Sequence, residues 1–600
     1  MKRFHTLWPW LAAVVSGAML ALCFAPARMG GLAWIALAPL VAAVWFAQPA
    51  ARFEKLRCFA LGYVAGAVYF IGSLAWLITV TGGGWIFLGL YLAFYPALWA
   101  LFLGTVAWPR EAHRLESTCV DSNRCEPMVH APQGAKPNNA IMQSRNNAIL
   151  TLWSNSWHNL FAAVAAASAW VALEWVRGHF LTGFGWNSLG VALNDNLAMI
   201  QIADVTGVAG LSFLLVMVSV IAAVTLKRLV QEIRERRMRA HWDFSLTVVL
   251  AALVFAYGVR RIYQSQQTPV ESLTMGYIAV QPNFPVMLNR TDEEDQMMRD
   301  VLRDLSVAGV KDFPEAIIKR ISESSMEKLD GKTFVLAPDL LVWPESVLPR
   351  PLFSDPLSKE TVEAVLANFD GTLLSGIVHY DADGDFNSSV MLTDGKVDIE
   401  TAQLYHKMHL VPFGEYVPLR GIFQWIGDIL PDGDFDAGRE PRILTTKNGI
   451  RVAPLICFED TLAHISRAFA QRGVQVLVNL TNDMWFERSA ASQQQRDNAV
   501  FRTVETRLPL LRVANTGVTC FIDAHGRQLN ILAHDGDTFV RDVLIGTAQI
   551  PIHPQQTFFT RYGEIFTVLC GFFALGVVGL SLRRSLTKQS GVFQNQREAS

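Results

Sequence analysis

Apolar residues in the first 262 positions gather into long runs, whereas between 262 and 562 shorter apolar runs alternate with amphipathic stretches. A helix needs about 20 apolar residues to cross the hydrocarbon core of a bilayer. The long runs therefore predict transmembrane helices, seven in the N-terminal part and one near the C-terminus. They lie near residues 8–25, 32–48, 58–80, 84–107, 159–177, 205–226, 244–261 and 563–582.

The first run has features of a secretory signal peptide, because Lys2 and Arg3 precede an apolar stretch that ends in LALCFAP. It also resembles a lipoprotein signal that ends at Cys23. However, Leu22 stands where cleavage needs a small residue, and further spans follow directly. We therefore predict that this run is retained as the first transmembrane helix.

Lys and Arg residues are concentrated in alternate connections between the predicted spans. Such residues mark the cytoplasmic side of a membrane protein. The connections at 51–57 (ARFEKLR) and 227–239 (KRLVQEIRERRMR) are basic, whereas TGGG at 81–84 has no charge. With eight spans, every basic connection and both termini fall on the cytoplasmic side, and the large segment 262–562 falls on the other.

This pattern divides the chain into three parts. We expect a seven-helix transmembrane domain at 1–261, an external domain at 262–562, and an eighth helix with a cytoplasmic tail at 563–600. The first part contains a cytoplasmic insertion at 108–158. Residues 108–150 of it are polar and rich in Asn, Gln and Pro, which is typical of a flexible segment.

The external segment of about 300 residues is long enough to bury one large core. Its apolar, β-rich runs and amphipathic stretches favour a layered α/β domain. Predicted strands lie at 274–281, 340–345, 372–380, 389–393, 451–459, 474–481 and 518–524, and predicted helices at 292–306, 313–329, 358–368, 460–472 and 491–507.

The composition agrees with a membrane protein, because 51% of the residues are hydrophobic and only 17% are charged, against about 25% charged in an average soluble domain. A formal net charge of −2 gives no indication of a nucleic-acid partner. The seven cysteines are scattered, without the spacing of a disulfide framework or a zinc site.

Side chains able to do chemistry stand at the ends of several predicted strands, as is common in α/β folds. A loop rich in Pro and Gly, YHKMHLVPFGEYVPLRG at 405–421, adds more of them. The strand ends supply Glu345, Cys457, Glu459, Asn482, Asp483 and Trp485, and the loop supplies Lys407, His409 and Glu415.

Taken singly, each of these residues also has a structural explanation. Free cysteine is among the most buried residue types, a carboxylate after Pro344 can cap a helix, and a loop lysine is normally solvated. Asn482 and Asp483 are turn formers, and His409 suits a structural hydrogen bond. Cys520 lies within an apolar strand and is expected in the core.

A thiol, a carboxylate and an ammonium together fit one type of covalent chemistry. The thiolate is the attacking form of cysteine, whose free pKa is about 8.5. A positioned carboxylate can take the thiol proton and later return it to a leaving group. An ammonium beside the thiol favours thiolate and then stabilises the oxyanion of a tetrahedral intermediate, together with a backbone N–H.

Six blocks of the sequence occur in the order of a known family and with comparable spacings: VQPNFP, VWPES, KMHLVPFGEYVPL, ICFED, NLTNDMWF and RLPLLRVANTGVT. With the eight predicted spans, they make the chain resemble the apolipoprotein N-acyltransferase family of the nitrilase (carbon–nitrogen hydrolase) superfamily. The similarity runs nearly end to end and is weakest at 108–150. It implies an α/β fold, a nitrilase-like αββα sandwich on a bundle of eight transmembrane helices.

The resemblance assigns three catalytic roles: general base to Glu345, oxyanion stabilisation to Lys407 and nucleophile to Cys457. Two supporting carboxylates, Glu415 and Glu459, match the family's positions, and Glu415 is expected to orient or charge-balance Lys407. The expected substrate-binding residues, with Phe486 beside them, are Phe413, Tyr416, Phe458, Asn482 and Trp485.

The sequence departs from the family at two places. Arg290 stands where a Trp often follows QPNFP, and Phe458 stands where Tyr is frequent. Both changes bear on the fit of the substrate, and neither removes one of the three catalytic residues.

The implied reaction is a two-step acyl transfer. Cys457 attacks the sn-1 ester of a phospholipid, expected to be phosphatidylethanolamine, and a thioester and a lysophospholipid form. The α-amine of the N-terminal S-diacylglyceryl cysteine of an apolipoprotein then takes the acyl chain, the final step of lipoprotein maturation. The resemblance also implies a location in the bacterial inner membrane with a periplasmic catalytic domain, and no cofactor, metal or nucleic-acid partner. A monomer is the default expectation, and the sequence leaves the oligomeric state open.

Two other functions compete with this interpretation. A membrane-anchored amidase or nitrilase would use the same three residues on a small amide, although one helix suffices as an anchor. A transporter or sensor would use the external domain only for binding, but transport pathways usually carry ionisable residues inside the spans, where this chain has almost none. Glu174, at the end of a span, is expected to pair with Arg177 on the same helix face, with headgroup binding as the alternative.

Overall fold

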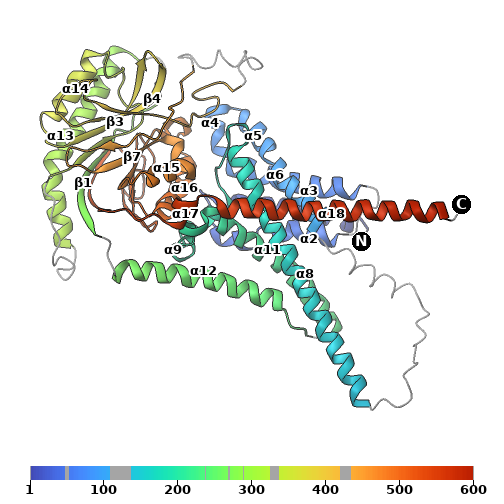
Figure 1. Cartoon of the computed structure of the whole chain (residues 1–600). Coiled ribbons are helices and arrows are strands. Elements are labelled where there is room, and N and C mark those ends of the chain that lie inside the picture. The colour runs from blue at the N-terminus through green and yellow to red at the C-terminus, as the bar shows by residue number, and fades with distance from the viewer. Residues whose placement is uncertain are drawn as a thin grey trace.

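The computed structural model describes residues 2–47, 53–107, 137–236, 238–267, 271–287, 290–323, 337–418 and 434–598. A bundle of long apolar helices forms one end of the molecule, and a domain with two β-sheets forms the other (Figure 1). Both chain termini lie on the side of the bundle, away from the sheets (Figure 1).

Six described helical segments are long and apolar enough to cross a membrane, two fewer than the eight predicted spans. At the other two predicted positions, 8–25 and 32–48, the described apolar helices are shorter, Thr6–Leu22 and Gly30–Phe46. The six segments are Glu54–Ser73, Gly84–Thr105, Ser156–His179, Val208–Glu235, Trp242–Gln267 and Ile565–Arg583.

One of these segments, Gly84–Thr105, and the shorter Gly30–Phe46 are each built from more than one helix. The long elements are α1 (Lys2–Leu22), α2 (Ala38–Phe46), α3 (Glu54–Ser73), α5 (Gly84–Leu92), α6 (Phe94–Phe102), α8 (Pro137–His179), α11 (Val208–Glu235), α12 (Trp242–Gln267) and α18 (Ile565–Glu598). Short turns join them: η1 (Gly30–Trp34), η2 (Ala75–Leu77), α4 (Ile78–Thr81), the π-helical η3 (Leu103–Ala107), η4 (Phe180–Thr182), η5 (Leu189–Leu193), α9 (Leu197–Ile200) and α10 (Ala203–Thr206).

The last third of the segment predicted to be flexible is helical, because α8 already begins at Pro137. That prediction was therefore wrong for 137–150, while 108–136 lies outside the described residues. Proline suits the first position of a helix, and the chain then has neither Pro nor Gly until Gly178. The polar composition thus lengthens a helix rather than forming a loop.

The external domain contains two six-stranded sheets, ordered β12-β1-β2-β3-β4-β5 and β11-β10-β9-β8-β7-β6. The central pairs of each sheet are parallel, and the pairs toward the edges are antiparallel. The strands are β1 (Ser272–Gln281), β2 (Leu340–Trp343), β3 (Thr372–Asp381), β4 (Gly384–Leu392), β5 (Gln403–His406), β6 (Leu444–Thr445), β7 (Arg451–Ile456), β8 (Val476–Thr481), β9 (Leu510–Ala514), β10 (Cys520–Ile522), β11 (Gln528–Ile531) and β12 (Asp542–Pro551).

The two sheets pack face to face between layers of helices (Figure 1). Along β1, Tyr277 faces the second sheet and stacks on Phe521 at 5.7 Å between ring centroids, while Ile278 packs under α13 (Asp292–Glu323) and α14 (Pro356–Leu366). This alternation is the period of a strand buried on both faces. The other outer layer, next to the bundle, is formed by α15 (Ala463–Gln471), α16 (Ala491–Thr506) and α17 (Phe558–Tyr562). The layer order agrees with the predicted sandwich.

The predicted strands and most of the predicted helices are present, but the two helices predicted at 292–306 and 313–329 form one continuous helix, α13, as far as Glu323. Gly309, between the two predicted helices, lies where α13 approaches the sheet closely, since a Cβ there would come within 3.1 Å of Ile278. Pro314 is accommodated within the helix. Packing on the sheet thus outweighs the local helix-breaking signals.

Candidate active site

Cys457 lies where β7 ends and a short 3₁₀ helix, η8 (Cys457–Thr461), begins. Its φ of +50° is in the left-handed region, which is uncommon for a residue with a side chain. Its carbonyl oxygen accepts hydrogen bonds from Asn479 Nδ2 at 3.0 Å and Gln495 Nε2 at 2.9 Å. This turn ends the strand at Ile456, earlier than the predicted 451–459, and places Cys457 at the carboxyl end of β7.

Glu345 follows β2 and is held by both of its carboxylate oxygens. Oε1 accepts hydrogen bonds from Asn387 Nδ2 at 2.9 Å and Lys407 Nζ at 3.4 Å, and Oε2 accepts one from the backbone N–H of Asn482 at 3.0 Å. Burial raises the pKa of Glu345, the Lys407 ammonium opposes this, and the Glu415 carboxylate adds to it. A raised carboxylate pKa suits a group that exchanges protons near neutral pH.

Lys407 follows β5, and its side chain is buried between two carboxylates. Its Nζ donates to Glu415 Oε1 at 2.8 Å and to Glu345 Oε1 at 3.4 Å. Burial by itself lowers the pKa of Lys407, but Glu415 and Glu345 outweigh it and raise the pKa above its ordinary value. The two carboxylates thus favour the charged form of Lys407, and Glu415 lies where it balances that charge.

The substitution Lys407→Met is expected to lower the free energy of unfolding by about 3–5 kcal/mol, because it leaves Glu345 and Glu415 buried together without the ammonium between them. Chemical denaturation of the detergent-solubilised protein measures this loss. Lys447→Met is the matched control, since Lys447 pairs with Asp370 at an exposed surface and such pairs contribute at most about 1 kcal/mol. Equal losses in the two variants would contradict the prediction.

Asn387, in β4, is a site residue that the sequence analysis missed. Its Nδ2 donates to Glu345 Oε1 at 2.9 Å and to Glu415 Oε1 at 2.6 Å, and its carbonyl oxygen accepts from the backbone N–H of Lys407. Asparagine is depleted in strands, so its presence in a buried strand was the signal that could have found it. Asn387 joins the two carboxylates that flank the ammonium.

The substitution Asn387→Ala is expected to shift the pH dependence of Cys457 acylation. The hydrogen bond from Asn387 lowers the pKa of Glu345, so removing it raises that pKa further. With Glu345 in its predicted role as general base, only its ionised form accepts the thiol proton, and the acidic limb of the rate profile should move to higher pH by about one unit. Acylation rates measured between pH 5 and 9 test this, with Asn368→Ala, on the surface at the end of α14, as the control. A uniform loss of rate without a shift would contradict it.

Glu459 accepts hydrogen bonds with both oxygens and supports the site from within. Tyr405 Oη donates at 2.9 and 3.0 Å, and the backbone N–H groups of Met408, His409 and Ile456 donate at 2.8, 3.2 and 2.8 Å. Burial raises the pKa of Glu459 to about 7. Glu459 thus fastens the loop that carries Lys407 to the turn that carries Cys457.

Asn482 and Asp483 both shape the site through structural contacts. Besides its N–H on Glu345, Asn482 caps η9 (Asp483–Phe486) by accepting from the Met484 N–H at 3.3 Å. Asp483 accepts from Arg512 Nη2 at 2.8 Å, and the same guanidinium donates to Asp460 Oδ2 at 2.7 Å. This fully buried ion-pair group fixes the ends of β8 and β9 relative to η8.

Of the expected substrate-binding aromatics, Phe458 and Trp485 lie at the border between the catalytic domain and the bundle. Phe413 and Trp485 are each about half exposed, and Tyr416 forms an isolated β-bridge with Pro412. Phe458 stacks on Trp186 of the bundle with ring planes 3° apart and centroids 6.0 Å apart.

Two further residues singled out in the sequence lie away from these aromatics. Arg290 is engaged at the start of α13, where it donates to Asp295 and to the Pro349 carbonyl. Cys520 is fully buried in β10, as predicted for a core residue. Among the described residues no group of three or more His, Cys, Asp or Glu has the arrangement of a metal site.

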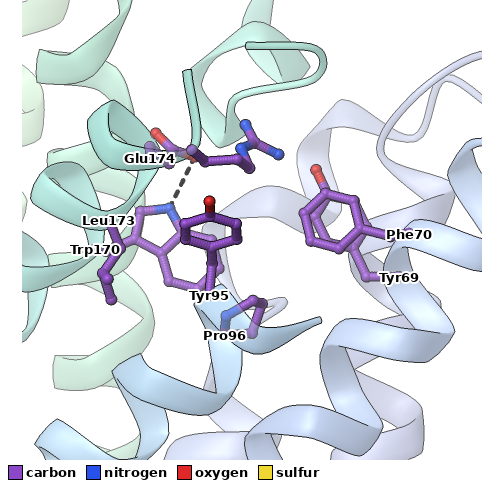
Figure 2. Close-up of a pocket in the computed structure, with 8 residues that line it drawn as sticks. Tyr69, Phe70, Tyr95, Pro96, Trp170, Leu173 and Glu174 are labelled. Carbon is purple, nitrogen blue, oxygen red and sulfur yellow. Dashed lines mark hydrogen bonds between the residues drawn. The ribbon is translucent and has the colours of Figure 1, made fainter. Parts of the chain in front are cut away.

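A polar cluster inside the bundle corrects one prediction. No ion pair joins Glu174 and Arg177, both of which the structure describes; Glu174 Oε1 instead accepts from Trp170 Nε1 at 2.9 Å (Figure 2) and from the Leu189 N–H at 2.8 Å. Arg177 donates to Ser188 Oγ at 3.4 Å. Glu174 and Arg177 thus each bind the chain at the start of η5, at Leu189 and Ser188, and do not pair with each other. The cavity beside them, which Tyr95 also lines, has a volume of about 20 Å³, room for one water rather than a headgroup.

Comparison with known proteins places these features in a family. Residues 16–122 and 140–221 match the family model for the apolipoprotein N-acyltransferase N-terminal domain, and residues 314–551 match the model for carbon-nitrogen hydrolases. An apolipoprotein N-acyltransferase of Geobacter metallireducens is 30% identical over 96% of this chain and 95% of its own length. One of Rhizobium rhizogenes is 31% identical over 68% of this chain and 72% of its own length. A solved amidase of Nesterenkonia sp. covers 50% of this chain and 99% of its own, at 15% identity and a TM-score of 0.33.

Proposed function

This chain belongs to the apolipoprotein N-acyltransferase family, and from that membership we propose that it acylates the N-terminal amine of diacylglyceryl apolipoproteins through a thioester at Cys457. The sequence similarity to apolipoprotein N-acyltransferases extends over the helical bundle as well as the catalytic domain. This extent favours the acyltransferase function over an amidase acting on small amides. The main support for the mechanism is that the buried side chains of Glu345 and Lys407 contact each other beside the turn that contains Cys457.

In the first step the sulfur of Cys457 attacks the sn-1 ester carbonyl of a phospholipid. Burial and the nearby Glu345 raise the pKa of the Cys457 thiol well above its ordinary value, so the resting group is a thiol and Glu345 takes its proton during attack. Lys407 Nζ stabilises the tetrahedral oxyanion. The ester C–O bond then breaks, and Glu345 gives the proton to the departing oxygen of the lysophospholipid.

In the second step the neutral α-amine of the diacylglyceryl cysteine attacks the thioester carbonyl. Glu345 takes a proton from the attacking nitrogen, and Lys407 again stabilises the oxyanion. The C–S bond breaks, an amide forms, and the proton passes to the Cys457 thiolate. An amine that arrives as an ammonium ion first loses one proton to water, so each such turnover releases one proton.

The location of the site supports a lipid substrate. Phe458 and Phe486, in the turns after Cys457 and Asn482, pack on Trp186 and Trp76 of the bundle, so an acyl chain would enter from the bilayer. We propose phosphatidylethanolamine as donor, with Phe413, Tyr416, Phe458, Asn482 and Trp485 along the entrance.

The charge pattern supports an orientation in the bacterial inner membrane. Both termini lie at the end of the bundle away from the sheets (Figure 1), and the basic connections of the sequence mark the cytoplasmic side. We therefore propose a periplasmic catalytic domain at 262–562 between a transmembrane domain at 1–261 and a final helix with a cytoplasmic tail at 563–600.

The proposal is tested by incubating the solubilised protein with phosphatidylethanolamine and a synthetic peptide that begins with S-diacylglyceryl cysteine. The peptide is expected to gain the mass of one acyl chain, and the same peptide with an acetylated amine is expected to stay unchanged. Without peptide, the protein should carry one acyl group that hydroxylamine removes. Hydrolysis of small amides with no acylation of the peptide would favour the amidase instead.

A further inference from the structure

Two tryptophans of the bundle lie directly against the turns that surround Cys457. Trp186 is parallel to Phe458, and Trp76 meets the ring of Phe486 edge-on at 4.8 Å between centroids. The two indoles also contact each other at 5.2 Å. We call Trp76 and Trp186 the indole pair; it forms a buried aromatic wall at the border of the two domains.

One amide of the catalytic domain fixes both members of the indole pair. Gln494, in α16, is almost completely buried, and its Oε1 accepts from Trp76 Nε1 at 3.0 Å and Trp186 Nε1 at 2.8 Å. The same oxygen accepts from Asn187 Nδ2 at 3.0 Å. Its Nε2 donates to the carbonyl oxygens of Ala25 and Ser73 at 2.7 and 3.0 Å. Two of these five hydrogen bonds therefore hold the indole rings, and the other three fix the amide that accepts them.

The neighbouring residue connects this wall to the nucleophile. Gln495 Nε2 donates to the Cys457 carbonyl oxygen at 2.9 Å and to Asp460 Oδ1 at 3.1 Å. Consecutive residues of one helix thus hold the indole pair and the turn of Cys457. The distance between the wall and the thiol is consequently fixed by a rigid element.

The segment that carries Trp186 is also held from the opposite side by the bundle. Tyr69 Oη donates to the Asn187 carbonyl oxygen at 2.7 Å, and Glu174 and Arg177 hold Leu189 and Ser188 as described above. A loop with this many buried polar contacts has one defined position. The polar side chains of the bundle therefore fix the segment of Trp186 from one side, and Gln494 fixes the indole rings from the other.

We propose that Gln494 is a positioning residue for the lipid donor, which it serves by orienting the indole pair as the wall along which the acyl chain lies during attack by Cys457. The inference rests on the proposed function, because it takes the donor to be a phospholipid. A chain that leaves the bilayer for Cys457 has to pass the border where the indole pair is buried. A displacement of about 1 Å at such a surface lowers the rate of reaction about 100-fold.

The test compares two acyl donors for the variant Gln494→Leu, which removes all five hydrogen bonds at similar volume. With phosphatidylethanolamine, kcat/KM for acylation of Cys457 is expected to fall about 100-fold. With p-nitrophenyl acetate, whose acyl group is too short to reach the wall, the rate is expected to change less than about threefold. An equal loss with both donors, or no loss with the phospholipid, would overturn the inference.

Gln201→Leu is the matched control, because Gln201 is also a buried glutamine that joins the two domains. Its Nε2 donates to the carbonyl oxygens of Leu197 and His525, and its Oε1 accepts from Arg507. Both donors should react with this variant at nearly the wild-type rate. A loss confined to the phospholipid would mean that domain docking in general, rather than the indole pair, is responsible, and would overturn the inference.

A second variant keeps the inference testable if Gln494→Leu does not fold. Trp186→Phe retains an aromatic ring but lacks the N–H that donates to Gln494. It should show the same difference between the two acyl donors, with a smaller loss of kcat/KM for the phospholipid, about 10-fold. Equal effects on both donors would again overturn the inference. A wild-type protein that reacts with the short ester but not with the phospholipid would overturn the proposed function, and this inference with it.

Discussion

The substitution Cys457→Ala is expected to abolish the acyl-enzyme and all transfer to the peptide. Removing the nucleophile of a catalytic triad lowers kcat on the order of 10⁶-fold, which is below detection here. After incubation with phosphatidylethanolamine, intact-mass spectrometry should show one hydroxylamine-labile acyl group on the wild-type protein and none on the variant. Peptide mapping should place the group on residue 457.

Cys520→Ala is the matched control, because Cys520 is the other cysteine of the catalytic domain and is fully buried in β10. This variant should be acylated like the wild-type protein. If Cys457→Ala still acquired a labile acyl group, or if Cys520→Ala lost it, the nucleophile would have been assigned wrongly.

The substitution Glu345→Gln is expected to slow acylation by about 10²–10⁴-fold, the usual contribution of a general base. Glutamine has nearly the shape of glutamate, but its amide has a single acceptor oxygen, so it keeps either the contacts with Asn387 and Lys407 or the contact with the Asn482 N–H. What is lost is the ability to take the thiol proton, and the raised pKa of Cys457 leaves little thiolate to react without a base. Single-turnover acylation followed by quenching and mass analysis measures the effect.

The pH dependence separates this role from simple damage to the fold. The pKa of Glu345 is raised above 4.5, and only the ionised form accepts a proton. The wild-type rate should therefore fall as the pH decreases through a midpoint above 4.5. In Glu345→Gln this acidic limb should disappear. A variant that retained the limb would point to another group as the base.

The sequence predicted which residues would form the candidate site because two of them stand at strand ends. Glu345 follows β2 of one sheet and Cys457 follows β7 of the other, and in α/β folds side chains able to do chemistry are common at the carboxyl ends of parallel strands. Lys407 was found through its Pro- and Gly-rich loop. The three are separated by up to 112 positions, yet local pattern and family resemblance located each one.

Apart from Glu415 and Glu459, the supporting contacts could not be predicted, because they depend on surfaces that only the folded chain brings together. The polar run QQQRDN of α16 reads as solvent-exposed, but Gln494 is buried against the bundle and Gln495 against the turn of Cys457. Asn387, in β4, meets Glu345, which follows β2, across the intervening strand β3. Glu174 and Arg177 have suitable spacing for an ion pair, yet the segment before η5 offers each of them a partner of its own.

The pairing of β1 with β12 determines when during synthesis the catalytic domain is complete. Ser272 of β1 lies opposite Pro551 of β12, so the first and last strands of the domain are hydrogen-bonded neighbours. About 260 residues separate them, which takes roughly 13–50 s to translate at typical rates. During that interval β1 has an unpaired edge and the sheet is unfinished. Until the last strand is synthesised, the edge of β1 is therefore open to edge-to-edge pairing with other chains.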